Sequence, residues 1–226
     1  MGRSPGARAS ASRGARREAL VRAAVELFSK HPYEDIYISD IAAAAGVAHG
    51  LLFYHFKDKR GLYLAALSQV MDEVSALHQS ASDAGSPADR LRALIRRHLE
   101  YRRDHPMTML AMMRTGRDPE IDRLYERSRE ATMTFIAELI GLPQPVSPRV
   151  RAAVRGCMGF IDEMTVDWLT HDCDIDLDEL EELAFSATVG ALSQVCTAEV
   201  DAAHLVDELR SGDGDSESAR VSSASR

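Results

Sequence analysis

The chain has 226 residues, 45% hydrophobic and 27% charged, with a formal net charge of −8. This length supports a small domain and a larger one with its own core. No run of about eighteen apolar residues occurs, and the Arg-bearing leader lacks the apolar segment of a signal peptide, so we expect a cytoplasmic protein with no membrane partner. Its three cysteines are odd in number and show no close paired spacing, which suits reduced thiols in a cytosol.

The charge is unevenly distributed along the chain. Residues 1–60 hold ten Lys and Arg against six Asp and Glu, a balance of +4, whereas the remainder holds 17 against 29. The acidic total therefore does not argue against nucleic-acid binding by the first part. Residues 1–14 are rich in Gly, Ser and Ala and are predicted to be a disordered basic arm. Such an arm either adds salt-sensitive contacts to phosphates or the minor groove, or is an idle terminus.

The first predicted helix covers residues 16–30. Its apolar stripe contains Leu20, Ala24, Leu27 and Phe28, and the pair His31-Pro32 ends it. This stripe predicts a helix that packs on the segment that follows.

A short helix, a tight turn and a second short helix follow over residues 38–56. Apolar residues at helical intervals give the first of these helices a buried face, and Gly46 ends it because glycine adopts the left-handed conformation of a tight C-cap without strain. The second helix, over residues 48–56, is expected to bury Leu52 and Phe56, which lie four residues apart. That arrangement leaves Phe53 and Tyr54 exposed, which is unusual unless they bind something. The pattern is typical of a DNA-reading helix-turn-helix.

The segment resembles the N-terminal domain of TetR-family transcriptional regulators. The matching positions are Ala24 to Phe28, Ile41-Ala42, Ala45-Gly46-Val47, Leu52 to Phe56, Lys59 and Leu62. The resemblance implies an all-α fold in which a three-helix domain, residues 15–60, is joined by a long helix to a larger helical ligand-binding and dimerisation domain, residues 61–208. It also implies a homodimeric repressor that binds a palindromic operator in double-stranded DNA and is released by a small molecule, without a cofactor or metal. Residues 209–226 are expected to form a disordered tail.

The residues expected to contact DNA lie in and beside the second short helix. They are Tyr37, Ser39, Ala48, His49, Gly50, Leu51, Phe53, Tyr54, His55, Lys57 and Lys59. Base edges are read by the start of that helix, and flanking groups hold phosphates. The chain departs from the family pattern at three of these positions. Tyr37 replaces a capping Thr or Ser, Leu51 replaces a small polar residue, and His55 stands where many members have Tyr.

Chain-breaking residues divide the remainder into predicted helices over 58–80, 88–103, 107–114, 120–140, 148–170 and 177–200. The last two carry apolar stripes with alternating steps of three and four residues, as helical bundles do. The resemblance implies that they form the dimer interface, with the alternative that the stripes only fill the core of one chain. The interface residues expected are Val154, Cys157, Ile161, Trp168, Ala187, Ala191 and Val195.

A hydrophobic or amphipathic effector is expected in the larger domain, where methionines at 107, 109, 112 and 113 supply adaptable apolar surface. The alternative is that these methionines are ordinary core. The residues expected to line the site are Tyr101, Met109, Met113, Phe135, Phe160 and Asp162. The carboxylate of Asp162 is the group that would meet a ligand amine or hydroxyl.

Two other classes of function remain open. The sequence His171-Asp172-Cys173-Asp174 is the only local cluster of candidate metal ligands or of a nucleophile and base, but it reads best as an acidic loop, and glycine-rich phosphate-binding motifs are absent. The second alternative is an all-helical dimeric interaction module that uses its helix-turn-helix only for packing. Neither a catalytic residue nor a metal site is predicted.

Overall fold

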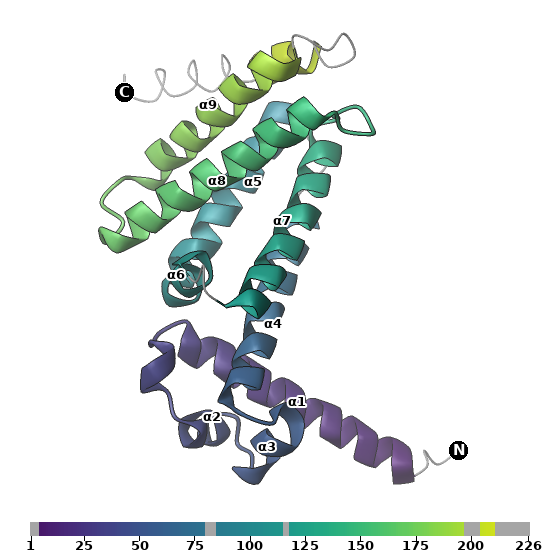
Figure 1. Ribbon diagram of the computed structural model, residues 1–226, viewed down its shortest axis with the longest axis vertical. Coiled ribbons are helices and arrows are strands. Elements are labelled where there is room, and N and C mark those ends of the chain that lie inside the picture. The colour runs from purple at the N-terminus through teal and green to yellow at the C-terminus, as the bar shows by residue number, and fades with distance from the viewer. Residues whose placement is uncertain (1–4, 80–84, 115–117, 197–203, 211–226) are drawn as a thin grey trace, which may run out of the picture. The chain divides into compact units, whose positions relative to one another are not determined.

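The computed structural model describes residues 5–79, 85–114, 118–196 and 204–210, with side chains for 13–76, 85–110, 118–196 and 204–210. All regular structure in these residues is helical (Figure 1), which confirms the all-α fold class. The elements are α1 Pro5–Phe28, η1 Tyr33–Asp35, α2 Ile38–Ala44, α3 Gly50–Phe56, α4 Lys59–Gln79, α5 Pro87–Asp104, α6 Pro106–Arg114, α7 Pro119–Leu139, α8 Pro148–Thr170 and α9 Leu177–Cys196. One more short helix covers 204–210.

Most helix limits agree with the sequence patterns to within two residues. The first helix differs, because α1 begins at Pro5 and includes ten residues that were predicted to be a disordered arm. Ala and Arg are strong helix formers, and extending an existing helix is easier than starting one, so the packed part of α1 favours helix in the residues before it. Residues 1–4 and the predicted tail beyond 210 lie outside the described part of the chain.

The helices group into two compact units. The first contains residues 1–73 and 105–125, and the second contains 74–104 and 126–226. Helices α4 and α7 each contribute to both units. The predicted boundary at residue 60 falls inside the first unit, which also includes α6 and the start of α7. The division of roles between a DNA-binding and a ligand-binding domain stays a prediction.

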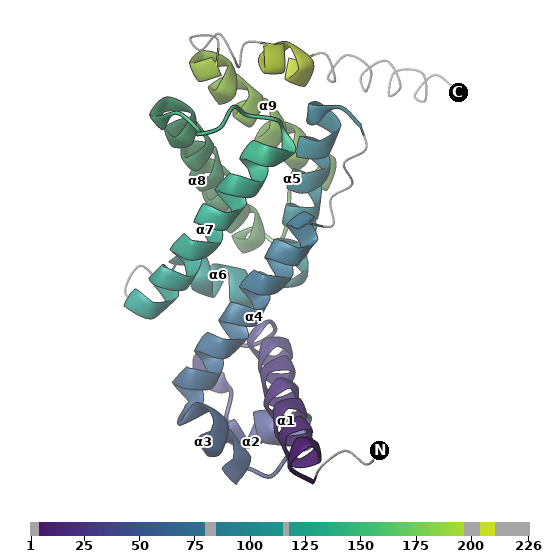
Figure 2. The same cartoon turned by 90° about the vertical axis from the view of Figure 1, so that its right-hand side faces the viewer.

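The core of the first unit comes from the apolar stripes of α1 to α4. Leu20, Ile41, Leu52 and Leu62 are completely buried, one from each helix in turn. Phe56 is also buried, as its spacing from Leu52 predicted. Helix α1 contacts both α2 and α3, and Figure 2 shows the same three helices together from a second direction. This packing fixes α3 on a rigid base.

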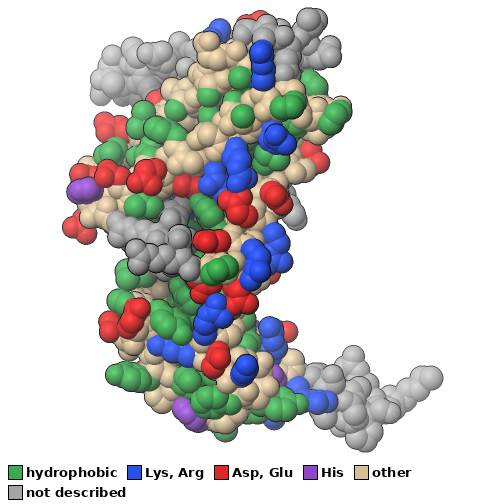
Figure 3. Space-filling model, viewed as in Figure 1, with side chains coloured by type: hydrophobic (Ala, Val, Ile, Leu, Met, Phe, Trp, Pro, Cys, Tyr) green, Lys and Arg blue, Asp and Glu red, His purple; other side chains and the backbone are tan. Residues whose placement is uncertain are grey.

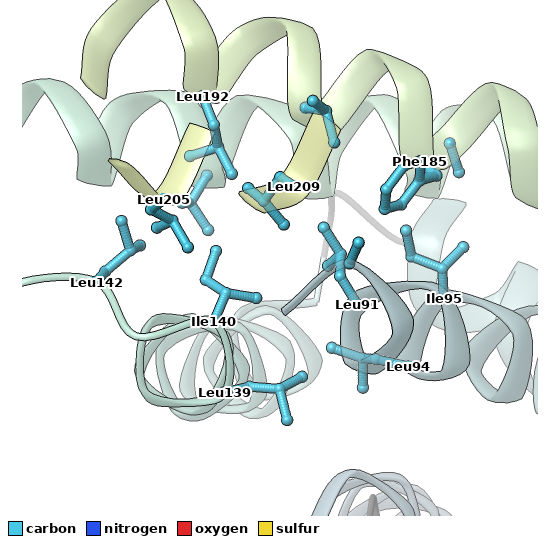
Figure 4. Close-up of a cluster of buried hydrophobic side chains, with 14 of the residues drawn as sticks. Leu91, Leu94, Ile95, Leu139, Ile140, Leu142, Phe185, Leu192, Leu205 and Leu209 are labelled. Carbon is cyan, nitrogen blue, oxygen red and sulfur yellow. The ribbon is translucent and has the colours of Figure 1, made fainter. Parts of the chain in front are cut away.

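The second unit is built around α5, α8 and α9, which contact one another in pairs. Its apolar core joins Leu91 and Ile95 of α5 to Phe185 and Leu192 of α9 (Figure 4). Leu205 and Leu209 from the short helix after α9 pack into the same cluster, together with residues at the end of α7. The buried Trp168 anchors the end of α8, where its indole N–H donates to the carbonyl of Ile175 at 2.9 Å.

Ion pairs reinforce the contact between α5 and α9. Arg92 pairs with Glu182 at 2.7 Å, and its guanidinium lies 3.7 Å from the centroid of the Phe185 ring. Arg96 pairs with Asp178 and, at 2.6 Å, with the buried carboxylate of Glu181. A basic face on α5 thus meets the acidic first turns of α9, where negative charge is also favoured by the helix dipole.

The apolar stripes of α8 and α9 lie largely inside this unit. Val154, Cys157 and Trp168 are at most 8% exposed in the single chain, and burial raises the pKa of the Cys157 thiol. Their own chain therefore already encloses these three side chains, and their predicted place in a dimer interface stays a prediction. Ile161, Ala187, Ala191 and Val195 are half-buried. The exposed large apolar residues on these helices are Phe160 and Leu183, neither of which is among the predicted interface residues.

Candidate nucleic-acid interface

The residue that precedes helix α2, Tyr37, makes no side-chain hydrogen bond that caps the start of the helix. The backbone N–H of Tyr37 donates to the Asp40 carboxylate at 3.0 Å, so Asp40 provides one half of a capping arrangement. The Tyr37 ring is 69% exposed, and Ser39 is exposed beside it. Asp40 thus replaces part of what a capping Thr or Ser would do, and Tyr37 and Ser39 are left facing solvent.

The turn between α2 and α3 has the geometry that its glycine predicted. Gly46 has φ +64°, and the N–H of Val47 donates to the carbonyl of Ala42 at 3.0 Å. An L-residue with a side chain is strained at this φ, whereas glycine is not. The turn therefore sets the angle at which α3 leaves α2.

The outward face of α3 is apolar and aromatic. Phe53 is 47% exposed and Tyr54 67%, and both exposures were predicted from the sequence. His49, at the N-cap, contacts the Phe53 ring edge to face, with centroids 5.6 Å apart, and Gly50 and Ala48 are exposed beside it. Leu51 is half-buried. Figure 3 shows hydrophobic side chains reaching the surface over α2 and α3.

The junction between α3 and α4 is tightly built. Lys57 caps α3 with φ +68° and leaves its side chain exposed, and the Asp58 carboxylate accepts a 2.7 Å hydrogen bond from the N–H of Gly61. A Cβ on Gly61 would lie 2.2 Å from the carbonyl oxygen of Phe56. The short step from the end of α3 into α4 thus depends on a residue without a side chain.

Lys59, which is predicted to contact a phosphate, also makes contacts within the first unit. Its ammonium donates to the backbone carbonyl of Tyr33 and lies 4.2 Å from the centroid of the Tyr33 ring. The side chain is half-buried and joins α4 to η1. Lys59 thus positions the start of α4, and its predicted contact with a phosphate stays a prediction.

His55 is also less accessible than predicted. Its Nε2 atom is buried and has no hydrogen-bond partner in the described residues, and its ring packs edge to face on Tyr54 at 5.0 Å. In this conformation Nε2 is not accessible to a phosphate, and the predicted DNA contact of His55 stays a prediction. Only the other edge of the imidazole remains for such a role.

Two features of the first unit escaped the sequence patterns. The guanidinium of Arg17 lies 5.1 Å from the centroid of the Phe56 ring and supports the end of α3 from α1. Arg60 pairs with Asp118 at 3.0 Å and Glu120 at 2.5 Å, which ties the start of α4 to the start of α7. Asp118 immediately before Pro119 is an N-cap signature in the sequence, but nothing local indicates its partner 58 residues away.

The residues predicted to line an effector site are divided between the two units. Met109 is buried in the first unit, Met113 lies outside the described side chains, and the other four belong to the second unit. Phe160 is 42% exposed, and Tyr101 and Phe135 are half-buried. The Asp162 carboxylate pairs with Arg102 and, at 3.5 Å, with Arg129, so two cations already occupy the position expected for a ligand amine.

The candidate catalytic loop has the features of an ordinary helix exit. Asp172 and Cys173 have positive φ values of 55° and 57°, and burial raises the pKa of the Cys173 thiol, which opposes thiolate formation. The imidazole of His171 lies 2.8 Å from the carbonyl of Asp167, and this hydrogen bond raises the His171 pKa. In the part of the chain that is described, no group of three or more His, Cys, Asp and Glu side chains is arranged to hold a metal ion.

The first unit therefore defines a helix-turn-helix protein with an exposed, aromatic second helix. Residues 20–66 match the family described as bacterial regulatory proteins, tetR family. The helices of residues 20–66 are thus those of a TetR-family transcriptional regulator, a class of proteins that bind DNA. Each helix among the described residues is too short or too polar to span a bilayer.

Similarity to known proteins extends beyond the DNA-binding helices. The chain is 28% identical over 160 residues to the HTH-type transcriptional regulator BetI of Stenotrophomonas maltophilia, covering 68% of this chain and 80% of BetI. It is 27% identical over 187 residues to the HTH-type transcriptional activator FasR of Mycolicibacterium smegmatis, covering 81% and 85%. A tetR-family regulator from Streptomyces coelicolor shares the fold with a TM-score of 0.78 at 23% identity, covering 93% of this chain and 98% of that one.

Proposed function

We propose that this regulator is a homodimeric repressor whose α3 helices read two half-sites of a palindromic operator. The observation that carries the proposal is the exposed face of α3, on which His49, Phe53 and Tyr54 stand clear of a rigid core. A major groove accepts one helix, and the residues at its start reach base edges. Exposed Lys57, together with Ser39 and Tyr37 at the start of α2, would hold phosphates on either side.

The proposed dimer interface lies on the outward faces of α8 and α9. Phe160 and Leu183 are 42% and 49% exposed, and hydrophobic side chains reach the surface over these helices in Figure 3. Gly156 precedes Phe160 by one turn and Gly190 follows Leu183 by two, and a Cβ on either glycine would meet nothing within 4 Å. The single chain therefore does not need these glycines for its own packing, whereas a helix of a second copy would use them for close approach. A two-fold dimer would place two α3 helices on half-sites about one helical turn apart.

Release by a small hydrophobic or amphipathic effector completes the proposal. An effector that prefers one conformation of the dimer would change the separation of the α3 helices and lower DNA affinity, and coupling of about 1 to 3 kcal/mol is typical. We propose that the bound protein represses transcription, whereas the similar FasR is an activator. Helix α4 would transmit the change because it contributes to both units.

The test is selection of the full chain against random duplex DNA, followed by titration of the enriched duplex at two salt concentrations. An enriched inverted repeat with strongly salt-dependent affinity is expected, because phosphate neutralisation releases counterions. Transcription in vitro from a promoter that contains the repeat then separates repression from activation. No enrichment and weak, salt-insensitive binding would support instead the all-helical interaction module.

A further inference from the structure

A cavity of about 480 Å³ lies in the first unit beside the start of α4. Its size falls within the range of about 300 to 1,000 Å³ that is common for small-molecule sites. The helices around it are the end of α1, η1, the first turns of α4, α6 and the start of α7. None of the residues predicted for an effector site lines it.

The floor of the cavity is apolar and aromatic. Phe28, Tyr63 and Ile121 are buried there, and Tyr33 and Leu64 are half-buried on its walls. The rings of Phe28 and Tyr63 meet edge to face at 4.7 Å, and that of Tyr33 lies 4.8 Å from Tyr63. These contacts hold the wall in one arrangement, so a ligand would not have to order it.

The rim of the cavity carries an excess of negative charge. Its lining contains two carboxylates, those of Glu34 and Asp118, against one permanent cation, Arg60. Arg60 is already paired with Asp118 and Glu120. Glu34 is exposed, and no hydrogen bond or ion pair from its carboxylate occurs among the described residues. An aromatic cavity with an unpaired carboxylate at its rim favours a ligand with an apolar body and a positive head.

We propose that this cavity binds an organic cation with an apolar body, which packs on Phe28, Tyr33, Tyr63 and Ile121 and directs its charge to Glu34. Tyr33 also accepts the hydrogen bond from Lys59, and Arg60 lies on the rim, so the ligand would contact the groups that hold the first two residues of α4. The ligand is thereby placed next to the junction that follows the DNA-reading helix. Its role as effector rests on the proposed function, whereas its binding does not.

The first experiment measures binding without DNA. Isothermal titration calorimetry of the full chain compares 4-phenylbutyltrimethylammonium with the anion 5-phenylpentanoate. We expect saturable binding of the cation and at least tenfold weaker binding of the anion, and a loss of about tenfold for the cation in Glu34→Gln. Asp35→Asn, which removes an adjacent exposed carboxylate outside the lining, is the matched control and should bind as the unmodified chain does. Glu34→Lys should reverse the preference between the two probes.

Equal affinity for the two probes, or unchanged affinity in Glu34→Gln, would overturn the site. The second experiment repeats the operator titration with saturating 4-phenylbutyltrimethylammonium, and a change in DNA affinity of at least about fivefold is expected. Unchanged DNA affinity would overturn the effector role alone. A chain that binds the cation but no duplex would refute the proposed function, and the effector role with it, while the cavity site would stand.

Discussion

The α-carbon of Gly61 lies so close to the carbonyl oxygen of Phe56 that an added Cβ would be 2.2 Å from it. Phe56 ends the helix proposed to read DNA, and Gly61 belongs to the first turn of the next one. The backbone oxygen cannot move aside as a flexible side chain would. This single contact therefore fixes how α4 leaves α3.

Gly61→Ala should consequently destabilise the junction. We expect the free energy of unfolding to fall by about 1 to 3 kcal/mol, the usual cost of forcing an extra methyl into a packed site. Urea denaturation measures it. Gly14→Ala is the matched control, because a Cβ there meets nothing within 4 Å, and alanine at this helical position should leave stability unchanged or raise it. Equal effects of the two substitutions would contradict the contact.

Lys57→Ala should weaken binding to every duplex by a similar factor. The exposed Lys57 ammonium is proposed to neutralise one phosphate, so the slope of log affinity against log salt should fall in magnitude by about 0.9. Fluorescence anisotropy at several salt concentrations measures the slope. Lys30→Ala removes an exposed lysine in the turn that follows α1 and should leave the slope unchanged. His49→Ala, in contrast, should alter the preference among sequences.

Leu183→Glu should prevent the proposed dimer. A carboxylate at this half-exposed apolar position would have to be desolvated in the interface, which is costly without a partner. Sedimentation equilibrium at micromolar concentration should give the mass of two chains for the unmodified protein and of one chain for the variant. Ala131→Glu, on the exposed face of α7, should remain dimeric. A monomeric unmodified protein would refute the dimer itself.

Asp162→Ala should destabilise the second unit strongly. The Arg102 side chain is 6% exposed and donates to Asp162 and, at 3.2 Å, to Thr165, so loss of the carboxylate leaves a buried cation without compensation. Breaking such a pair costs about 3 to 5 kcal/mol of unfolding free energy. The neighbouring Glu163 is exposed, and Glu163→Ala should stay within about 0.5 kcal/mol of the unmodified chain in the same urea titration.

Tyr63 should titrate well above an ordinary tyrosine. Burial, together with the nearby charge of Glu34, raises the pKa of its phenol from 10.0 to about 12. Between these values the unfolded chain releases the proton and the folded chain keeps it, so the contribution of Tyr63 to stability should be constant below pH 10 and fall as the pH rises toward 12. The absorbance of tyrosinate, recorded as the difference between the unmodified chain and Tyr63→Phe, isolates this group. A difference titration centred near pH 10 would contradict the burial of the phenol.

The sequence by itself determined the local features of this protein. Helical spacing placed Leu52 and Phe56 in the core and Phe53 and Tyr54 outside, and the conformational freedom of Gly46 located the turn, because these properties depend on residues a few positions apart. The match to the TetR family depends on the same short stretch.

Only the tertiary structure decided which charged groups are paired, and which apolar stripes are buried, within the chain itself. Lys59 donates a hydrogen bond to Tyr33, and Asp162 forms ion pairs with two arginines. Trp168 and Val154 pack in the core of their own unit. Each of these contacts joins segments that a local sequence pattern cannot connect. A stripe of apolar residues has the same spacing whether it faces its own domain or a partner. The cavity beside Tyr63 likewise exists only because α1, α4, α6 and α7 converge there.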